Sequence, residues 1–229
     1  MPKPSMIAID GPVASGKSTI GRLLAQRLGY RFVDTGAMYR ALTWRAIKLN
    51  IDLEDEGELS RLAASTKIEF APPEDYSSVF VDGHDVTREI QDWEVEAGVS
   101  LVARVAGVRK VLVEQQRGLA QKGEIVMAGR DIGTTVLPHA ELKVYLVASF
   151  KERARRRYQE LVERGKAADY EAILADLIRR DELDSERSIS PLQPPLGARI
   201  VNTDGLTLEQ VLGKIFGIIK EHILEGRNL

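Results

Sequence analysis

Residues 6–18 read MIAIDGPVASGKS, from Met6 to Ser18. The last eight of them match the pattern G-x-x-x-x-G-K-[ST] at every fixed position. An apolar run precedes the match and a helical pattern follows it, which is the strand, loop and helix context of a P-loop. Glycines let backbone N–H groups turn inward onto phosphate oxygens, and the following helix presents its positive end to them. The stretch therefore predicts a site for the phosphates of a nucleoside triphosphate.

Individual positions of this loop have expected tasks. Lys17 is predicted to reach the β- and γ-phosphates, and the Ser18 hydroxyl to ligate Mg²⁺. The alternative is a glycine-rich turn that matches by chance, and the strand–loop–helix context argues against it. The residues predicted to bind ATP here are Gly11, Pro12, Val13, Ala14, Ser15, Gly16, Lys17, Ser18 and Thr19.

Outward from the loop, segments with strand-like and helix-like patterns alternate. Further strands are expected at residues 31–33, 124–127, 142–147 and 198–201. Helices are expected at 20–28, 37–49 and 95–119, after an Asp169 cap, and from 208 behind a capping box of Thr207 and Gln210. The alternation predicts an α/β fold: a P-loop NTPase-type parallel sheet covered by helices on both faces.

One segment breaks this alternation. Residues 67–70 and 79–81 are short strand-like pieces, which predict a small antiparallel insertion. Residues 79–83 also resemble the apolar strand ending in Asp that holds Mg²⁺ in many P-loop NTPases. Because Asp82-Gly83 after a short apolar run is typical of a hairpin turn, we favour the turn.

The composition narrows the class of protein. The 229 residues suit one domain, and 32 basic against 34 acidic residues give a net charge of −2. This balance predicts no broad attraction to nucleic acid or to a membrane surface. No cysteine is present, and His84, His139 and His222 lack metal-ligand spacing, which argues against a disulfide framework or a metallohydrolase. The N-terminal apolar run is too short for a signal peptide or a membrane span, so we expect a cytoplasmic protein.

Arginines follow the ends of predicted strands. Arg40 lies one helical turn beyond strand 31–33, and Arg130 follows strand 124–127 closely. Ligands of an open parallel sheet bind at the carboxyl ends of its strands, and the planar fork of arginine matches phosphate oxygens. These positions predict a small acceptor molecule that carries a phosphate.

A further group lies near the C-terminal end of the chain. Arg180, Asp184 and Arg187 are spaced i, i+4 and i+7, which places them on one face if the segment is helical. Taken alone, this spacing is typical of an ordinary ion pair on the surface of a helix. Together with Arg40 and Arg130 they favour an anion site, because phosphoryl transfer depends on positioning and charge stabilisation.

A basic run occupies residues 151–158, with Arg153, Arg156 and Arg157 on one helical face. One interpretation is a lid that closes over ATP and expels water. The other is a solvated helix face, and the sequence leaves both open. A nucleic-acid patch is disfavoured, because the run has a single aromatic residue and acidic neighbours.

The chain contains the stretches IDGPVASGKST, VDTGAMYRAL, GRDIGTTVLP, LKVYLVAS followed by KERARRRYQEL, and RRDELDSERSISPL. Together they resemble the bacterial cytidylate kinase family over essentially the whole chain, and DTGAMYR with GRDIGT is far more specific than the P-loop. The resemblance implies reversible transfer of the γ-phosphate of ATP to CMP or dCMP, with Mg²⁺ as cofactor. We expect a monomer whose partners are these small substrates.

The resemblance also implies an organisation and a set of roles. Residues 1–229 would form one kinase domain, with a core of 1–61 and 96–229, an inserted nucleoside-monophosphate-binding subdomain at 62–95, and a helical lid at 150–168. The implied clamp on the acceptor phosphate is Arg40, Arg130 and Arg187, and the implied catalytic residues are Lys17, Arg130 and Arg187.

The implied cytosine-reading group is Ser100, Arg109 and Asp131. A carboxylate can accept from the exocyclic amine of cytosine and an arginine can donate to its ring acceptors, whereas uracil presents a carbonyl in place of the amine. By the same resemblance, Arg180 and Asp184 look like ribose contacts, Thr35 like a hydroxyl beside the acceptor, and Arg157 like a lid residue near the adenine of ATP.

One position departs from the family. Ala128 stands just before Gly129-Arg130-Asp131, where members of the family often carry an acidic residue. Alanine cannot order water bound to Mg²⁺. Either Asp10, Asp34 or solvent replaces the missing carboxylate, or metal affinity is reduced, and the sequence leaves the choice open.

Other functions remain as alternatives. A P-loop kinase for another small acceptor, such as UMP, AMP or a metabolite like shikimate, would share the triphosphate site. The insertion and the GRD segment argue against the metabolite kinases. A GTPase or ATPase switch is disfavoured, because no N-K-x-D guanine-reading motif is present and Asp82-Gly83 is a poor switch element.

Overall fold

The computed structural model describes residues 3–71, 75–76, 78–187 and 189–225. A five-stranded parallel sheet forms its centre, with the strand order β2-β6-β1-β7-β8. The strands are β1 (Met6–Asp10), β2 (Arg31–Asp34), β6 (Ile125–Gly129), β7 (Leu142–Val147) and β8 (Arg199–Asn202). The pairing register sets Asp34 beside Ala128 and Asp10 beside Gly129, so three strands end at the same edge. The predicted parallel sheet is confirmed.

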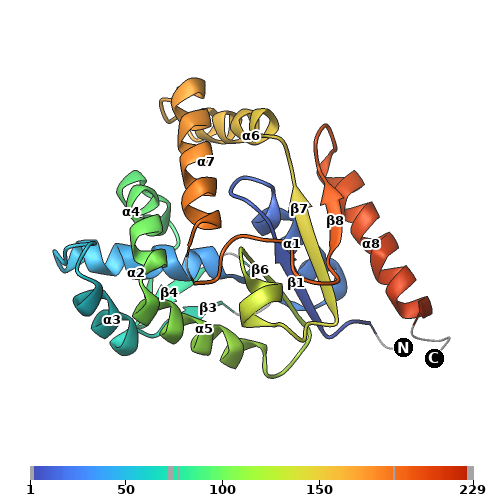
Figure 1. The fold of residues 1–229 in the computed structure, drawn as a ribbon, viewed down its shortest axis with the longest axis horizontal. Coiled ribbons are helices and arrows are strands. Elements are labelled where there is room, and N and C mark those ends of the chain that lie inside the picture. The colour runs from blue at the N-terminus through green and yellow to red at the C-terminus, as the bar shows by residue number, and fades with distance from the viewer. Residues whose placement is uncertain (1–2, 72–74, 77, 188, 226–229) are drawn as a thin grey trace.

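Helices cover both faces of this sheet (Figure 1). One face carries α1 (Lys17–Leu28) and α8 (Leu208–Glu225), and the other carries α2 (Thr35–Lys48), α3 (Glu56–Ser65), α4 (Trp93–Arg104) and α5 (Ala106–Ala120). Strand β1 shows why both faces must be covered: Ile7 and Ile9 pack into the α1 and α8 cluster, while Ala8 packs into the opposite cluster. Burying one such isoleucine side chain stabilises the fold by roughly 1.5–3 kcal/mol.

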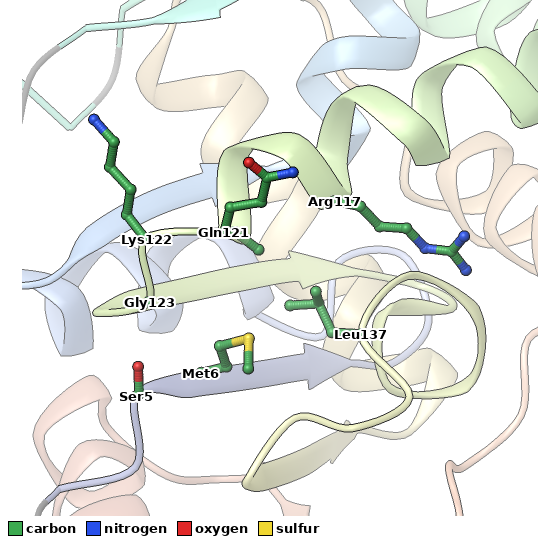
Figure 2. Close-up of a pocket in the computed structure, with 8 residues that line it drawn as sticks. Ser5, Met6, Arg117, Gln121, Lys122, Gly123 and Leu137 are labelled. Carbon is green, nitrogen blue, oxygen red and sulfur yellow. The ribbon is translucent and has the colours of Figure 1, made fainter.

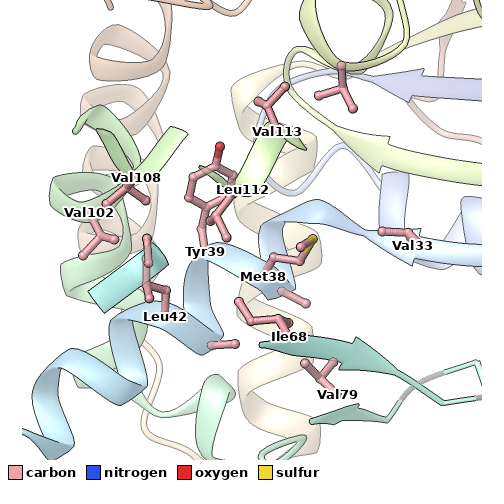
Figure 3. Close-up of a cluster of buried hydrophobic side chains, with 14 of the residues drawn as sticks. Val33, Met38, Tyr39, Leu42, Ile68, Val79, Val102, Val108, Leu112 and Val113 are labelled. Carbon is pink, nitrogen blue, oxygen red and sulfur yellow. The ribbon is translucent and has the colours of Figure 1, made fainter. Parts of the chain in front are cut away.

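The predicted insertion is a separate antiparallel sheet. It consists of β3 (Ile68–Phe70), β4 (Val79–Val81) and β5 (His84–Asp85). Asp82 and Gly83 join β4 to β5 with positive φ angles of 48° and 83°, as a type I′ hairpin turn requires. The turn interpretation of this segment is therefore confirmed. Val79 and Val81 pack into the same buried cluster as α2, which Figure 3 shows in part.

Two helical features differ from the sequence predictions. The helix expected at 95–119 is two helices, because Val105 adopts an extended conformation between α4 and α5. Val105 is buried, and a Cβ atom at Gly107 would lie 2.1 Å from the Ser60 Oγ of α3. Gly107 thus allows close packing of α5 against α3, a contact that the sequence analysis did not predict. Asp55 caps α3 by accepting from Glu58 N at 2.8 Å.

The predicted helix caps near the C-terminus are confirmed. Asp169 accepts hydrogen bonds from Glu171 N and Ala172 N at the start of α7 (Tyr170–Ser185). Thr207 and Gln210 exchange the two hydrogen bonds of a capping box before α8. In the described part of the chain, no helix combines the length and apolarity that a membrane span requires.

Candidate active site

The P-loop lies between β1 and α1. Gly11 has a φ of 147°, and a Cβ atom there would lie 2.2 Å from the Leu146 carbonyl oxygen of β7, so only glycine fits. Gly16 precedes α1 with a φ of 94°, and no side chain caps the helix. The first N–H groups of α1 are therefore available to phosphate oxygens, as the motif predicts.

Lys17 begins α1 and folds back over the loop. Its Nζ donates to the Pro12 carbonyl oxygen at 2.5 Å and to Ser15 Oγ at 3.4 Å. Burial, followed by the charge of nearby Arg130, lowers the pKa of Lys17 to about 7. An anion between these two cations would offset both effects, so the site is built to gain from a bound phosphate.

Two carboxylates lie near the loop in different environments. Asp10 is fully buried, and its two oxygens accept from Ile132 N at 2.6 Å and Gly133 N at 2.8 Å. Burial raises the pKa of Asp10 to about 6 even though these hydrogen bonds lower it. Asp34 instead accepts from the Ser18 hydroxyl at 3.0 Å and from Arg40 at 3.3 Å, both at Oδ2.

An arginine-rich cluster lies across from the P-loop. Arg130, at the end of β6, and Arg187 both form ion pairs with Asp184 of α7. Arg180, one turn earlier on α7, has only a 3.8 Å contact to Asp176. Burial and the neighbouring Arg130 lower the pKa of Arg180, because several cations share few carboxylates. This excess of positive charge is what an anionic ligand would neutralise.

The expectation that Arg187 shares a helical face with Arg180 and Asp184 is wrong. The helix ends at Ser185, so Arg187 lies beyond it and not on its face. Its guanidinium nevertheless reaches Asp184, which lies only three residues earlier in the chain. The predicted grouping of Arg180, Asp184 and Arg187 is thus present in space, with a different local geometry.

The predicted base-reading residues are partly brought together. Arg109 and Asp131 form an ion pair in which both side chains are buried. Arg109 also donates to the Ala103 carbonyl oxygen at 3.3 Å and lies 5.6 Å from the centre of the Tyr39 ring. Ser100 lies half-buried on α4, and its membership of this group stays a prediction.

Thr35 begins α2 and is buried. Its hydroxyl donates to the Ala128 carbonyl oxygen at 3.0 Å, which ties α2 to the end of β6. A Cβ atom at Gly129 would lie 2.4 Å from the same hydroxyl. The structure therefore gives Thr35 a structural contact, and its role beside the acceptor stays a prediction.

The basic run forms α6 (Phe150–Glu163), which lies with α7 beyond the carboxyl end of β7 (Figure 1). Arg153 is only 2% exposed, donates to the Val13 carbonyl oxygen of the P-loop at 3.0 Å, and pairs with Asp181 at 2.6 Å. Arg156 donates to the Thr203 carbonyl oxygen at 2.6 Å. A solvated face is therefore the wrong interpretation for Arg153, whose contact with the P-loop the sequence analysis did not predict.

Arg157 links the same helix to the acceptor side. It pairs with Glu96 of α4 and with Glu160 of its own helix, the latter at 2.8 Å. Its predicted proximity to adenine stays a prediction. Only the dense basic run itself pointed to the contacts with Val13, Thr203 and Glu96, because these partners lie far away in the sequence.

A hollow of about 350 Å³ lies elsewhere, near the amino ends of β1 and β6 (Figure 2). Ser5, Met6 and Gly123 line it, at the edge of the sheet opposite the P-loop. Of its two cationic residues, Arg117 already donates to the Val136 and Thr135 carbonyl oxygens at 3.1 Å and 2.7 Å, and Lys122 is exposed. We therefore place the active site at the carboxyl edge.

Comparisons with known proteins bear on the family of this chain. The profile of the family described as "Cytidylate kinase" matches residues 7–221. A protein named cytidylate kinase from Bacillus subtilis (strain 168) is 45% identical, over 96% of this chain and 99% of its own length. One from Geobacillus sp. (strain WCH70) is 48% identical, over 95% of this chain and 97% of its own.

A gluconokinase structure from Sinorhizobium meliloti 1021 has a TM-score of 0.51 at 15% identity, covering 95% of this chain and 93% of that one. At this identity the likeness shows a shared fold. The family match and the full-length relatives show that this chain belongs to the cytidylate kinase family.

Proposed function

We propose that this protein transfers the γ-phosphate of Mg·ATP to CMP or dCMP, giving ADP and CDP or dCDP. The observation that carries the proposal is the cluster of Arg130, Arg180 and Arg187 facing the P-loop lysine. This cluster supplies a second anion site at the same edge of the sheet as the P-loop, which is the first. Membership of the cytidylate kinase family supports the choice of acceptor.

The reaction needs two phosphates held close together. The P-loop backbone and Lys17 would hold the triphosphate, while Arg40, Arg130 and Arg187 would hold the acceptor phosphate. An oxygen of the acceptor phosphate then forms a bond to the γ-phosphorus, and the bond from that phosphorus to the β–γ bridging oxygen breaks. The leaving ADP keeps the bridging oxygen. The cationic groups stabilise the charge that spreads over the transferred group.

Mg²⁺ fits the oxygen donors at the P-loop. Magnesium is commonly bound through one or two protein oxygens together with substrate phosphates and water. The Ser18 hydroxyl is such a donor, and it donates to the Asp34 carboxylate at 3.0 Å, whereas the described residues include no group of three or more His, Cys, Asp or Glu side chains that could hold a metal alone. When bound, the metal would neutralise charge on the β- and γ-phosphates.

The Arg109–Asp131 pair supports cytosine as the base. Asp131 would accept from the exocyclic amine, and Arg109 would donate to the ring acceptors. Because the pair is buried, a base that leaves either group unsatisfied would bind at a cost.

An acceptor panel tests the proposal. ADP release from Mg·ATP is followed in a coupled assay with CMP, dCMP, UMP, AMP and shikimate offered separately. We expect rapid turnover with CMP and dCMP and little with the others. Turnover with a different acceptor would retain the phosphotransferase activity and overturn the assignment of Arg109 and Asp131. No acceptor-dependent turnover would overturn the proposal as a whole.

Arg153 offers a test of the donor side. Arg153→Lys keeps the charge but loses the planar fork that joins Val13 to Asp181. We expect the KM for ATP, measured at saturating CMP, to rise up to about tenfold, because a lost charge-assisted hydrogen bond of about 1.5–3 kcal/mol holds the P-loop and acts on ATP only through it. Arg155→Lys on the same helix is the matched control, since Arg155 is half-exposed and its partners among the described residues, Glu152 and Gln159, lie within α6. Equal changes in both variants would contradict a role of Arg153 in holding the P-loop for ATP.

A further inference from the structure

The hydrogen bond between Ser18 and Asp34 fixes the direction of a hydroxyl proton. Ser18 Oγ lies 3.0 Å from Asp34 Oδ2. A serine hydroxyl has one proton and two lone pairs, and an ionised carboxylate can only accept. The proton therefore points at Asp34, which leaves the lone pairs of Oγ free for a cation. Contacts of this kind orient metal ligands in many sites.

Three strands end beside the P-loop, and only one of them supplies an available carboxylate. β1 ends in Asp10, whose oxygens both accept from backbone N–H groups of the π-helical turn Ile132–Val136, which follows β6. β6 ends in Ala128 and Gly129, which have no carboxylate. β2 ends in Asp34, which the sheet register sets directly beside Ala128. Asp34 thus occupies the neighbouring strand end.

The surroundings of Asp34 leave room for water. Its side chain is 19% exposed, and the hydrogen bonds from Ser18 and Arg40 both use Oδ2. A Cβ atom at Gly36 would lie 3.1 Å from Asp34 Oδ1 and 3.2 Å from Arg40 Nη1. The absence of a side chain at Gly36 keeps both atoms clear.

We propose that Asp34 is the residue that positions Mg²⁺, by orienting the Ser18 hydroxyl and accepting a hydrogen bond from metal-bound water. Through Arg40, the same carboxylate connects the metal side of the site to the clamp on the acceptor phosphate. This proposal rests on the proposed use of Mg·ATP. It resolves the question raised by Ala128 in favour of Asp34 over Asp10.

A simpler role is that Asp34 only pairs with Arg40. That pair is partly exposed and 3.3 Å long, so its own contribution to stability is small. The two roles differ in what they predict for metal binding without acceptor, and a binding experiment separates them.

The experiment measures metal binding directly. Mn²⁺, which takes the same oxygen ligands as Mg²⁺, is titrated into the protein with a non-hydrolysable ATP analogue, and free Mn²⁺ is followed by electron paramagnetic resonance. Affinity for the same analogue is measured separately in EDTA. For Asp34→Asn we expect Mn²⁺ affinity about 10- to 100-fold weaker and unchanged analogue affinity in EDTA.

Two further variants make the result specific. Asp82→Asn is the matched control, because Asp82 pairs with Arg45 at 2.8 Å and is partly exposed in the hairpin turn far from Ser18. It should bind Mn²⁺ like the unchanged protein. Asp34→Glu keeps a carboxylate, so Mn²⁺ affinity should recover in part, and this variant tests the proposal if Asp34→Asn melts early.

Two outcomes would overturn the proposal. Unchanged Mn²⁺ affinity in Asp34→Asn would leave Asp34 as a partner of Arg40 only. Equal weakening with and without metal would mean that Asp34 shapes the P-loop and does not position the metal. Because no acceptor is present, failure of the CMP assignment in the acceptor panel would leave these results standing.

Discussion

Lys17→Met is expected to lower kcat about 100- to 1,000-fold, the usual effect of removing one group that stabilises charge in the transition state. The side chain begins α1 inside the P-loop, where its ammonium would meet the β- and γ-phosphates. The measurement is steady-state turnover at saturating ATP and CMP. Lys122→Met, at an exposed position near the opposite edge of the sheet, is the control and should retain full activity.

The same variant should fold, and be more stable than the unchanged protein near neutral pH. The folded-state pKa of Lys17 is lowered from 10.5 to about 7, so between these values the unfolded chain binds more protons. Stability of the unchanged protein therefore rises as pH increases from about 7 towards 10, while below pH 7 the full penalty of a buried charge is present. Methionine removes that charge.

Thermal unfolding from pH 6 to 10 measures this effect. We expect the variant to melt at a higher temperature at pH 6, with the difference shrinking as pH rises. Loss of cooperative unfolding in Lys17→Met would show that the lysine is structural, and the assignment to phosphate would be wrong.

Asp131→Asn is expected to lower kcat/KM for CMP about 10- to 100-fold and to leave the value for UMP nearly unchanged. An amide can donate to the uracil carbonyl but supplies one acceptor oxygen where the carboxylate had two, so it discriminates less between the two bases. Such a change corresponds to about 1.4–2.7 kcal/mol of transition-state stabilisation. The measurement is kcat/KM for both acceptors at saturating ATP.

The buried ion pair requires a second readout. Removing the charge of Asp131 leaves Arg109 buried without its partner, which also destabilises the fold. Thermal unfolding therefore accompanies the kinetics, at a temperature where both proteins are folded. Equal losses with CMP and UMP would make Asp131 a structural partner of Arg109 and remove it from base reading.

Local sequence determined several elements of this protein correctly. The P-loop, the hairpin turn at Asp82 and Gly83, and the capping box at Thr207 depend on residues within a few positions of each other. Backbone angles and short-range hydrogen bonds encode such features directly. The parallel sheet was predictable for a related reason, since its apolar strands alternate with helical patterns.

Contacts between distant residues were decided only by the tertiary structure. Gly107 of α5 approaches Ser60 of α3 closely, and the burial of Arg153 depends on Val13 and Asp181, which are 140 and 28 residues away. The choice between Asp10 and Asp34 had the same origin. Both follow strands, but only the register of the sheet and the turn after Arg130 engage one carboxylate and leave the other beside Ser18. Sequence by itself determined which chemical groups reach this edge, whereas packing determined which of them remain free to bind, because burial and hydrogen-bond partners are properties of the whole fold.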